Sequence, residues 1–443
     1  MMITISSIME KAFLLGILLV PFGVFAQSSN YPSAWTLENC IAFAKQNNIS
    51  INSLRLSKNS AQQDLLQAKE AKYPNLNGTF SQGLFAVNGQ NGLNVNGAQS
   101  QSIGANSSMT LYHDHYIKNN EMSKNLLLQM SDLSVKEAEN NISVSIAQAF
   151  LNILMMKENI VSIESLLQTS EIQLKQGSQL YNAGSISKLQ YLQLEIQFAQ
   201  DQFNLVQAQN SLRSDVLNLK QLLQLPSDYD LQISSPENIT VSAGIRSLGE
   251  IQNTAQNSRP EIKYSELNVQ NAETGLKMAQ ASIKPTLNLV GNISTGYNFG
   301  NGGYLNQLGN NFYLPVGLSL GIPIYNNRIY KTSIEKSKIE IDQAHLNLKN
   351  TQLTLNQQIE QAYISLQNSV SQYESAQKQF DLNRQSLDIV NAEMKIGSIN
   401  YVQLQQQRLL YIQALQNYLQ AKYSAVLNRQ IYEFYSTNQI TLQ

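Results

Sequence analysis

Two short stretches, YNAGSISKLQ at Tyr181–Gln190 and MKIGSINYVQ at Met394–Gln403, interrupt the two longest helical patterns of the chain. Each contains a glycine, Gly184 or Gly397, which can take the left-handed conformation that ends a helix. A polar residue follows that can cap the next helix, with a glutamine three positions later, which is the spacing of a capping box. These capping pairs are Ser187 with Gln190 and Asn400 with Gln403. Each stretch therefore predicts a tight turn between two antiparallel helices.

The two turns belong to two copies of one larger unit. Beyond each turn the same polar residues recur at the same spacing: Gln193, Gln200, Asn204 and Gln207 in the first half, and Gln406, Gln413, Asn417 and Gln420 in the second. A repeat of this length indicates duplication of a whole module rather than a solenoid. Each copy is predicted to run helix, strand, loop, strand, long helix, turn, long helix. We expect the first repeat at residues 27–225, a linker at 226–249 and the second repeat at 250–443.

Each repeat contains a predicted pair of strands, at about residues 75–112 and 286–325. From Phe312 to Ile324, large apolar residues occupy every second position, opposite glycine, serine and tyrosine. Alternation over about ten residues is typical of a transmembrane β-strand with one lipid face and one wet face. A soluble sandwich with one wet face would alternate in the same way. Four strands in so long a chain, each near the length of a bilayer crossing, favour the membrane.

The helical segments show the heptad pattern of coiled coils. From Ile142 to Leu167, and again from Ile359 to Phe380, positions four and three residues apart are mostly apolar. A helix from about Lys118 to Tyr181 would be roughly 95 Å long at ~1.5 Å per residue. A two-helix hairpin of this length cannot cover its own faces, so neighbouring hairpins must pack side by side.

Four strands are too few to close a barrel, and an open sheet edge cannot face lipid. The smallest closed membrane barrels have about eight strands, so at least two chains must contribute. Cyclic symmetry allows two, three or four copies. A barrel that continues into a ring of helical hairpins forms a tube with a wet interior.

Composition excludes several other classes of protein. Only 14% of the 443 residues are charged and the net charge is −1, which disfavours nucleic acid or an anionic membrane surface as a partner. Residues 1–26 combine Lys11, an apolar run and small residues before Gln27, which predicts a secretory signal peptide. An anchor helix is the alternative, but the run is shorter than the ~20 residues that a span needs. Cys40, the only cysteine, lies in an amphipathic pattern that predicts a buried thiol.

No constellation of residues indicates catalysis, a cofactor or a metal site. His113 and His115 would share one face at a strand end and could hold a metal, but the matching residues of the second repeat, Asn326 and Arg328, are no ligand pair. We therefore expect a polar junction between strand and helix there. The Asp and Glu residues are spread along the helices with the spacing of an ordinary solvated surface.

Several motifs, taken together with their order and spacing, resemble the TolC-like outer-membrane efflux proteins over nearly the whole chain after the signal segment. They are WTLENCIAFAKQNN from Trp35, SRPEIKYSEL from Ser258, VGLSLGIPIYNNR from Val316 and the two G-S-I turns. The resemblance implies a mixed α/β membrane protein: a homotrimer with a 12-stranded β-barrel, four strands from each chain, continued by a periplasmic α-helical barrel. It also implies a passive exit duct in the outer membrane, joined by a periplasmic adaptor to an inner-membrane transporter, with no enzyme activity.

The same resemblance assigns roles to the two turns. The docking residues toward the adaptor would be Gly184, Ser185, Ile186, Gly397, Ser398 and Ile399. Relatives often carry aspartates at the positions of Gln403 and Gln406, where they ring the axis and narrow the entrance. Glutamines can still narrow an entrance through hydrogen bonds, but a carboxylate ring would also attract cations. We therefore expect a weakly ion-selective entrance.

Two alternatives remain at this point. One is a coiled-coil adhesive or structural protein on the cell surface, anchored by a β-barrel. The other is a soluble periplasmic protein that binds a metal through His113 and His115. The first would direct the long hairpins outward, away from the side of the N-terminus, and the second would be extracted without detergent.

Overall fold

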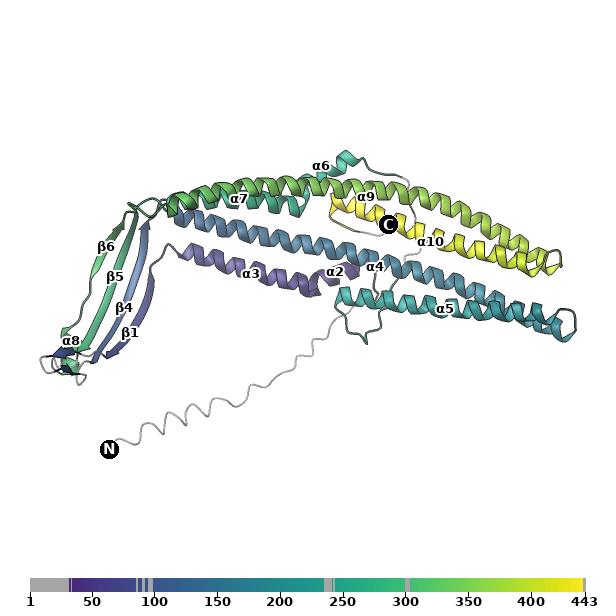
Figure 1. The fold of residues 1–443 in the computed structure, drawn as a ribbon, viewed down its shortest axis with the longest axis horizontal. Helices are drawn as coiled ribbons and strands as arrows, with labels where there is room; N and C mark the ends of the chain where they lie inside the picture. Colours follow the sequence, from purple (N-terminus) through teal and green to yellow (C-terminus); the bar gives the residue numbers. More distant parts are fainter. Residues whose placement is uncertain are drawn as a thin grey trace, which may run out of the picture.

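The structure is a computed structural model that describes residues 32, 34–84, 87–89, 92–94, 99–234, 241, 244–298 and 303–440. The expected signal peptide, residues 1–26, lies outside the described residues. The described chain is elongated, with a β-sheet at one end and two helical turns at the other (Figure 1). Long helices connect the two ends, and a set of shorter helices packs along them.

The sheet has four antiparallel strands in the order β1-β4-β5-β6. The strands are β1 (Asn75–Leu84), β4 (Gln99–Tyr112), β5 (Thr286–Asn298) and β6 (Val316–Gly321), and a small hairpin is formed by β2 (Val87–Gly89) and β3 (Gly92–Asn94). The register aligns the predicted apolar face across strands, since Met109 pairs with Leu289, and Leu289 with Leu318. The opposite face carries polar residues such as Asn106 and Asn292, which pair directly.

The last strand is shorter than the sequence predicts. Alternation suggested a strand from Phe312 to Ile324, but β6 covers only Val316–Gly321. Pro315 and Pro323 flank β6, and proline has no backbone N–H to donate to a ladder. Before Pro315 the chain still follows β5 at one bridge, where Tyr313 and Ser294 exchange backbone hydrogen bonds of 2.8 and 2.9 Å.

The loop between β5 and β6 also contains a helix that the sequence did not predict. Helix α8 (Tyr304–Asn310) lies in the stretch predicted as the loop between the two strands of the second repeat. It is fastened to β5 by a 2.6 Å hydrogen bond from Thr295 Oγ1 to the Leu308 carbonyl. A second bond, 3.0 Å long, runs from Asn311 Nδ2 to the Gly296 carbonyl.

The helices form a wall that is four helices wide. Two 67-residue helices, α4 (Tyr116–Asn182) and α9 (Ile329–Lys395), run its whole length. The shorter helices are α2 (Leu37–Asn47), α3 (Ile49–Glu70), α5 (Lys188–Leu223), α6 (Leu248–Ser258), α7 (Pro260–Ala281) and α10 (Tyr401–Thr437). Beside the sheet the contacts give the order α3-α4-α7-α9, and beside the turns α5-α4-α10-α9 (Figure 1).

The duplication is visible in the backbone where each repeat passes from strand to long helix. Asp114 and His115 precede α4 with φ of 32° and 63°, and Asn327 and Arg328 precede α9 with φ of 50° and 68°. Positive φ is uncommon for residues other than glycine. Two consecutive left-handed residues at both junctions therefore record a shared, copied turn.

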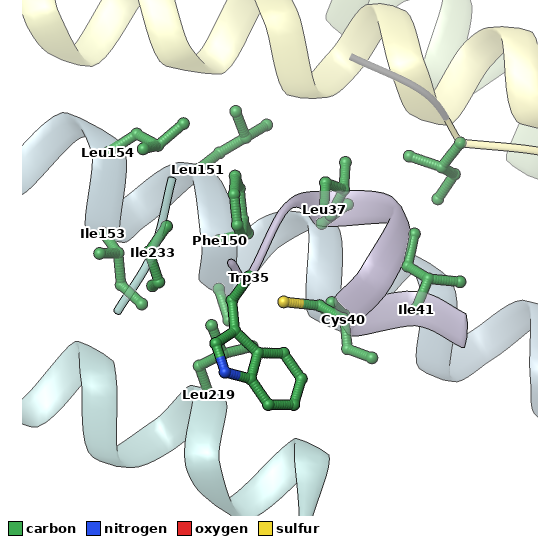
Figure 2. Packing of buried hydrophobic residues seen from close by; sticks show 14 of the residues in the cluster. Trp35, Leu37, Cys40, Ile41, Phe150, Leu151, Ile153, Leu154, Leu219 and Ile233 are labelled. Atoms are coloured by element: carbon green, nitrogen blue, oxygen red, sulfur yellow. The ribbon is translucent and has the colours of Figure 1, made fainter. Parts of the chain in front are cut away.

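The largest core cluster lies midway along the wall, where α2 meets α4 and α5 (Figure 2). Trp35 and Phe150 are each only 1% exposed, and the Trp35 indole donates a 3.0 Å hydrogen bond to Tyr229 Oη. A parallel bridge between Trp35 and Ile233 ties the N-terminal segment to the linker. Cys40 is fully buried in this cluster, and burial raises the pKa of its thiol to about 12. The prediction of a buried, unreactive cysteine is thus confirmed.

Among the described helices, none combines the length and apolar character needed to cross a membrane.

Candidate docking tips and duct entrance

Both turns at the far end of the wall have the same hydrogen-bond pattern. Two residues after α4 ends, Gly184 has φ 73°, and the Ser185 N–H donates to the Leu180 carbonyl at 2.8 Å. Two residues after α9 ends, Gly397 has φ 75°, and the Ser398 N–H donates to the Glu393 carbonyl at 3.0 Å. A left-handed glycine followed by this backward bond is the Schellman ending of a helix.

The following helices begin with complete capping boxes. At α5, the Gln190 N–H donates to Ser187 Oγ at 3.2 Å and the Ser187 N–H donates to Gln190 Oε1 at 2.9 Å. At α10, the Gln403 N–H donates to Asn400 Oδ1 at 3.0 Å and the Asn400 N–H donates to Gln403 Oε1 at 3.2 Å. These bonds satisfy backbone groups at the end of one helix and at the start of the next, so each turn is capped within its own chain.

Around the turns the glycines and serines are exposed, with open space where a Cβ on Gly184 or Gly397 would lie. The isoleucines Ile186 and Ile399 are half-buried. Three further apolar side chains at the same end of the wall are exposed and were not predicted from the sequence. Leu189 is 66% exposed, Ile396 80% and Val402 55%. They adjoin the G-S-I motifs in sequence, so extending each motif by a few residues would have found them.

The two glutamines predicted to narrow the entrance have different surroundings. The Gln403 side chain is committed to the capping box of α10. Gln406, one turn later, is exposed. Neither carries charge, and the nearest charged residue along α10 is Arg408.

Arg408 forms an ion pair that sequence reasoning missed. Its guanidinium contacts the Asp201 carboxylate of α5, and the two side chains are only 5% and 2% exposed. Arg408 also donates to the Leu166 carbonyl of α4 at 3.2 Å, and Gln197 Nε2 donates to Asp201 Oδ1 at 2.9 Å. The interpretation of all acidic residues as solvated surface is therefore wrong for Asp201, because α10 covers it. A lone arginine in the otherwise uncharged start of α10 was the available signal.

A second link joins the same helices closer to the middle of the wall. Lys422 Nζ lies 3.0 and 2.9 Å from the two carboxylate oxygens of Glu158, and Tyr423 Oη donates to Glu158 at 2.9 Å. Near the tip, Tyr401 Oη donates to the Gln193 carbonyl at 2.9 Å. Three polar contacts thus fasten α10 to the first hairpin of the same chain.

The HDH motif lies in the turn between β4 and α4 rather than on a strand face, since β4 ends at Tyr112. This corrects the expectation that His113 and His115 share one face of a strand end. His113 stacks on Tyr116 with ring centroids 4.5 Å apart, and the His115 side chain is 74% exposed. Within the described residues, no cluster of three or more His, Cys, Asp or Glu side chains could hold a metal.

Comparison with known proteins shows to which family this chain belongs. A model of the family described as Outer membrane efflux protein matches residues 41–224 and 251–430, so the chain belongs to this family. TolC of Escherichia coli is 22% identical over 434 residues, which cover 93% of this chain and 84% of TolC. Nodulation protein T of Rhizobium leguminosarum is 25% identical over 49% of this chain, and that match spans 44% of the nodulation protein. The solved structure of CusC superposes with a TM-score of 0.76 at 16% identity, over 92% of each chain.

These matches confirm the predicted fold class, in which four strands per chain contribute to a β-barrel that a long helical barrel continues. The family consists of outer-membrane channels rather than enzymes. The chain is accordingly an outer-membrane efflux channel subunit, with its sheet in the membrane and its helices in the periplasm.

Proposed function

We propose that three copies of this chain form the passive exit duct of a tripartite efflux or secretion system. A periplasmic adaptor docks on the helical tips, and an inner-membrane transporter supplies the energy. Cargo, small molecules or a secreted polypeptide, passes through the helical barrel and leaves through the β-barrel. The main observation in support of this proposal is that the sheet and the helical wall of the described chain each have two unpaired edges, and that the edges of the sheet lie on the same sides as those of the wall.

The edges are arranged for head-to-tail assembly. Strands β1 and β6 bound the sheet, while α5 and α9 bound the wall on the corresponding sides. Both boundary helices expose large apolar side chains: on α5 these include Ile196, Phe203 and Val206, and on the tip half of α9 Leu382 and Ile389. Pairing β1 with the β6 of a neighbour, and α5 with its α9, would cover these surfaces in one rotation, which produces a closed ring. Three such rotations give a 12-stranded barrel of ordinary size.

Conductance of the purified protein in planar lipid bilayers tests the duct directly. The proposal predicts step-like, stable ion currents from single detergent-extracted assemblies. Protease treatment of intact cells tests the adhesin alternative. Cleavage between Lys136 and Leu225 from outside the cell would favour the adhesin, because the duct places this region in the periplasm.

We expect valine at the tip glycines to weaken docking of the adaptor. Gly397→Val places a β-branched side chain at φ 75°, which costs roughly 1–3 kcal/mol in strain and adds bulk where another backbone would approach. Efflux in cells should fall at least tenfold while conductance in bilayers stays unchanged. Gly249→Ala, an exposed helical glycine far from the tips, is the control. Full efflux by a variant carrying valine at both Gly184 and Gly397 would contradict the docking role.

We expect aspartate at the entrance to make the duct cation-selective. Gln403→Asp combined with Gln406→Asp adds two carboxylates per copy at one level of the tube, where they attract cations. Single-channel recordings should show little block of the unchanged protein by a multivalent cation and strong block of the double variant. Gln202→Asp, at an exposed position of α5, is the control. Strong block of the unchanged protein that Gln403→Ala abolishes would overturn the uncharged entrance.

A further inference from the structure

Glutamines recur every seven residues on both helices that follow the tips. They are Gln193, Gln200 and Gln207 on α5, and Gln406, Gln413 and Gln420 on α10. All except the half-buried Gln193 are exposed. Seven residues make nearly two turns of a helix, so each set forms a stripe with members about 10.5 Å apart. We call these two sets the amide stripes.

On α10 the amide stripe faces away from both neighbouring helices. Two residues along a helix lie about 200° apart around its axis. Arg408 and Lys422, which contact the first hairpin, each stand two residues after a stripe glutamine. Tyr411 and Tyr418, which contact Phe380 of α9, each stand two residues before one. These four contacts of α10 therefore lie on the side opposite the stripe, while the bond from Gln407 Nε2 to Asn383 of α9 lies about 100° around the helix from it.

The α5 stripe has the same orientation. Val216, which packs in the main core cluster, lies nine residues after Gln207 and hence about 180° around the helix. The exposed apolar residues of α5 lie to one side of the stripe, since Ile196 and Phe203 each stand three residues after a stripe glutamine. One face of α5 thus packs in the core, a second carries the exposed apolar residues, and the face with the amide stripe is exposed to solvent.

The amide stripes lack charge. From Asn400 to Ala421 the only charged residue of α10 is Arg408, which is buried against Asp201. On the matching part of α5 the charged residues besides the buried Asp201 are the exposed Lys188 and the half-buried Glu195. Glu195 stands two residues after Gln193, so it points to the opposite side of the helix.

Several stripe amides are held by hydrogen bonds to the residue four positions later, and one of these bonds occurs in both repeats. Gln200 Nε2 donates to Asn204 Oδ1 at 3.0 Å, and at the matching positions Gln413 Nε2 donates to Asn417 Oδ1 at 3.0 Å. Gln420 Nε2 donates to Ser424 Oγ at 3.2 Å. Each amide pair has further capacity, since a glutamine oxygen accepts and an asparagine amino group donates. The stripes are therefore ordered rows of uncharged donors and acceptors.

We propose that the amide stripes line the duct and form a track for uncharged, polyhydroxylated cargo of the oligosaccharide class. This inference rests on the proposed function, in which the Gln406 position faces the axis. A hydrogen bond between a cargo hydroxyl and an amide replaces hydrogen bonds to water, so the net gain per contact is small and each contact is brief. Because the glutamines are regularly spaced, an oligosaccharide chain can keep some of its contacts while it breaks others. Anionic and cationic chains find no counter-charge on these faces.

Single-channel recording with a neutral oligosaccharide, maltohexaose, tests the track. Maltohexaose should cause brief, resolvable interruptions of the current, and oligogalacturonate of equal length should cause fewer. Gln413→Leu combined with Gln420→Leu removes two of the three glutamines of the α10 stripe from every copy, and the mean interruption should shorten by about threefold or more, as expected for the loss of a net hydrogen bond. Gln202→Leu, exposed and two residues after a stripe glutamine, is the matched control and should leave it unchanged.

The outcomes separate this inference from the proposed function. Absence of any conductance would overturn the duct itself and the track with it. Normal conductance without maltohexaose interruptions, or with interruptions of equal length in the double leucine variant, would overturn the track alone. If the leucine variant does not assemble, Gln413→Ser with Gln420→Ser removes the same amides without adding an apolar surface, and the same shortening is expected.

Discussion

Replacing Arg408 by methionine should destabilise the tip half of the wall by about 3–5 kcal/mol, because the Asp201 carboxylate would stay buried without its counter-charge. The pair fixes α10 against α5 and, through the Leu166 carbonyl, against α4. Its loss should release the second hairpin from the first. Thermal unfolding followed by circular dichroism, and proteolysis of the purified protein near residues 395–410, would measure the effect.

Two further variants identify the cause. Asp201→Leu with Arg408→Met removes both charges and should recover most of the lost stability, since a buried apolar pair replaces a buried ion pair at little cost. Arg384→Met is the control, because Arg384 is exposed and its contact with Asp381 is 3.8 Å long. If the single and the double variant are destabilised equally, side-chain packing rather than charge pairing stabilises the contact between the two hairpins.

The ion pair is specific to one seam of the wall. At the matching positions of the duplicated unit, Glu195 corresponds to Arg408 and Ala414 to Asp201, so no pair can form there. The contact between the two hairpins of one chain therefore contains a buried ion pair, and the corresponding contact between chains has none. The contact between chains is where we expect the hairpins of an assembled duct to separate more easily.

Truncating Phe150 to alanine should cost about 3–5 kcal/mol, because its ring is 1% exposed in the core cluster where α2 packs on α4. Trp35 belongs to the same cluster and is the only tryptophan of the chain, so its fluorescence reports on this region without labelling (Figure 2). We expect a red-shifted emission and a lower melting temperature. Val161→Ala, on an exposed face of α4, is the control, and an unchanged emission in Phe150→Ala would contradict the assigned packing.

The sequence predicted those parts of the fold that local chemistry determines. The glycine turns and their capping boxes depend on a few adjacent residues, and both have the expected form. Prediction was poorer where local signals conflict. In 312–324 the alternation was continuous, but Pro315 and Pro323 shorten the strand, and α8 forms in a segment rich in glycine and asparagine.

The contacts between hairpins could not be predicted from the sequence. Asp201 and Arg408 are 207 positions apart, and nothing in either neighbourhood predicts that the Arg408 side chain of α10 contacts the Asp201 carboxylate of α5. Heptad periodicity shows that each hairpin needs neighbours but not which faces meet. The amide stripes were visible as repeated residues, but their orientation depends on the contacts of Arg408 and Tyr418 in the folded wall.

The copy number and closure of the assembly are tested most directly by electron cryo-microscopy of the protein in lipid nanodiscs. The account predicts three chains around one axis, with β1 of each paired to β6 of the next and the amide stripes facing the interior of the tube. A ring of another copy number, an open four-stranded sheet, or amide stripes on the outer surface of the wall would contradict it.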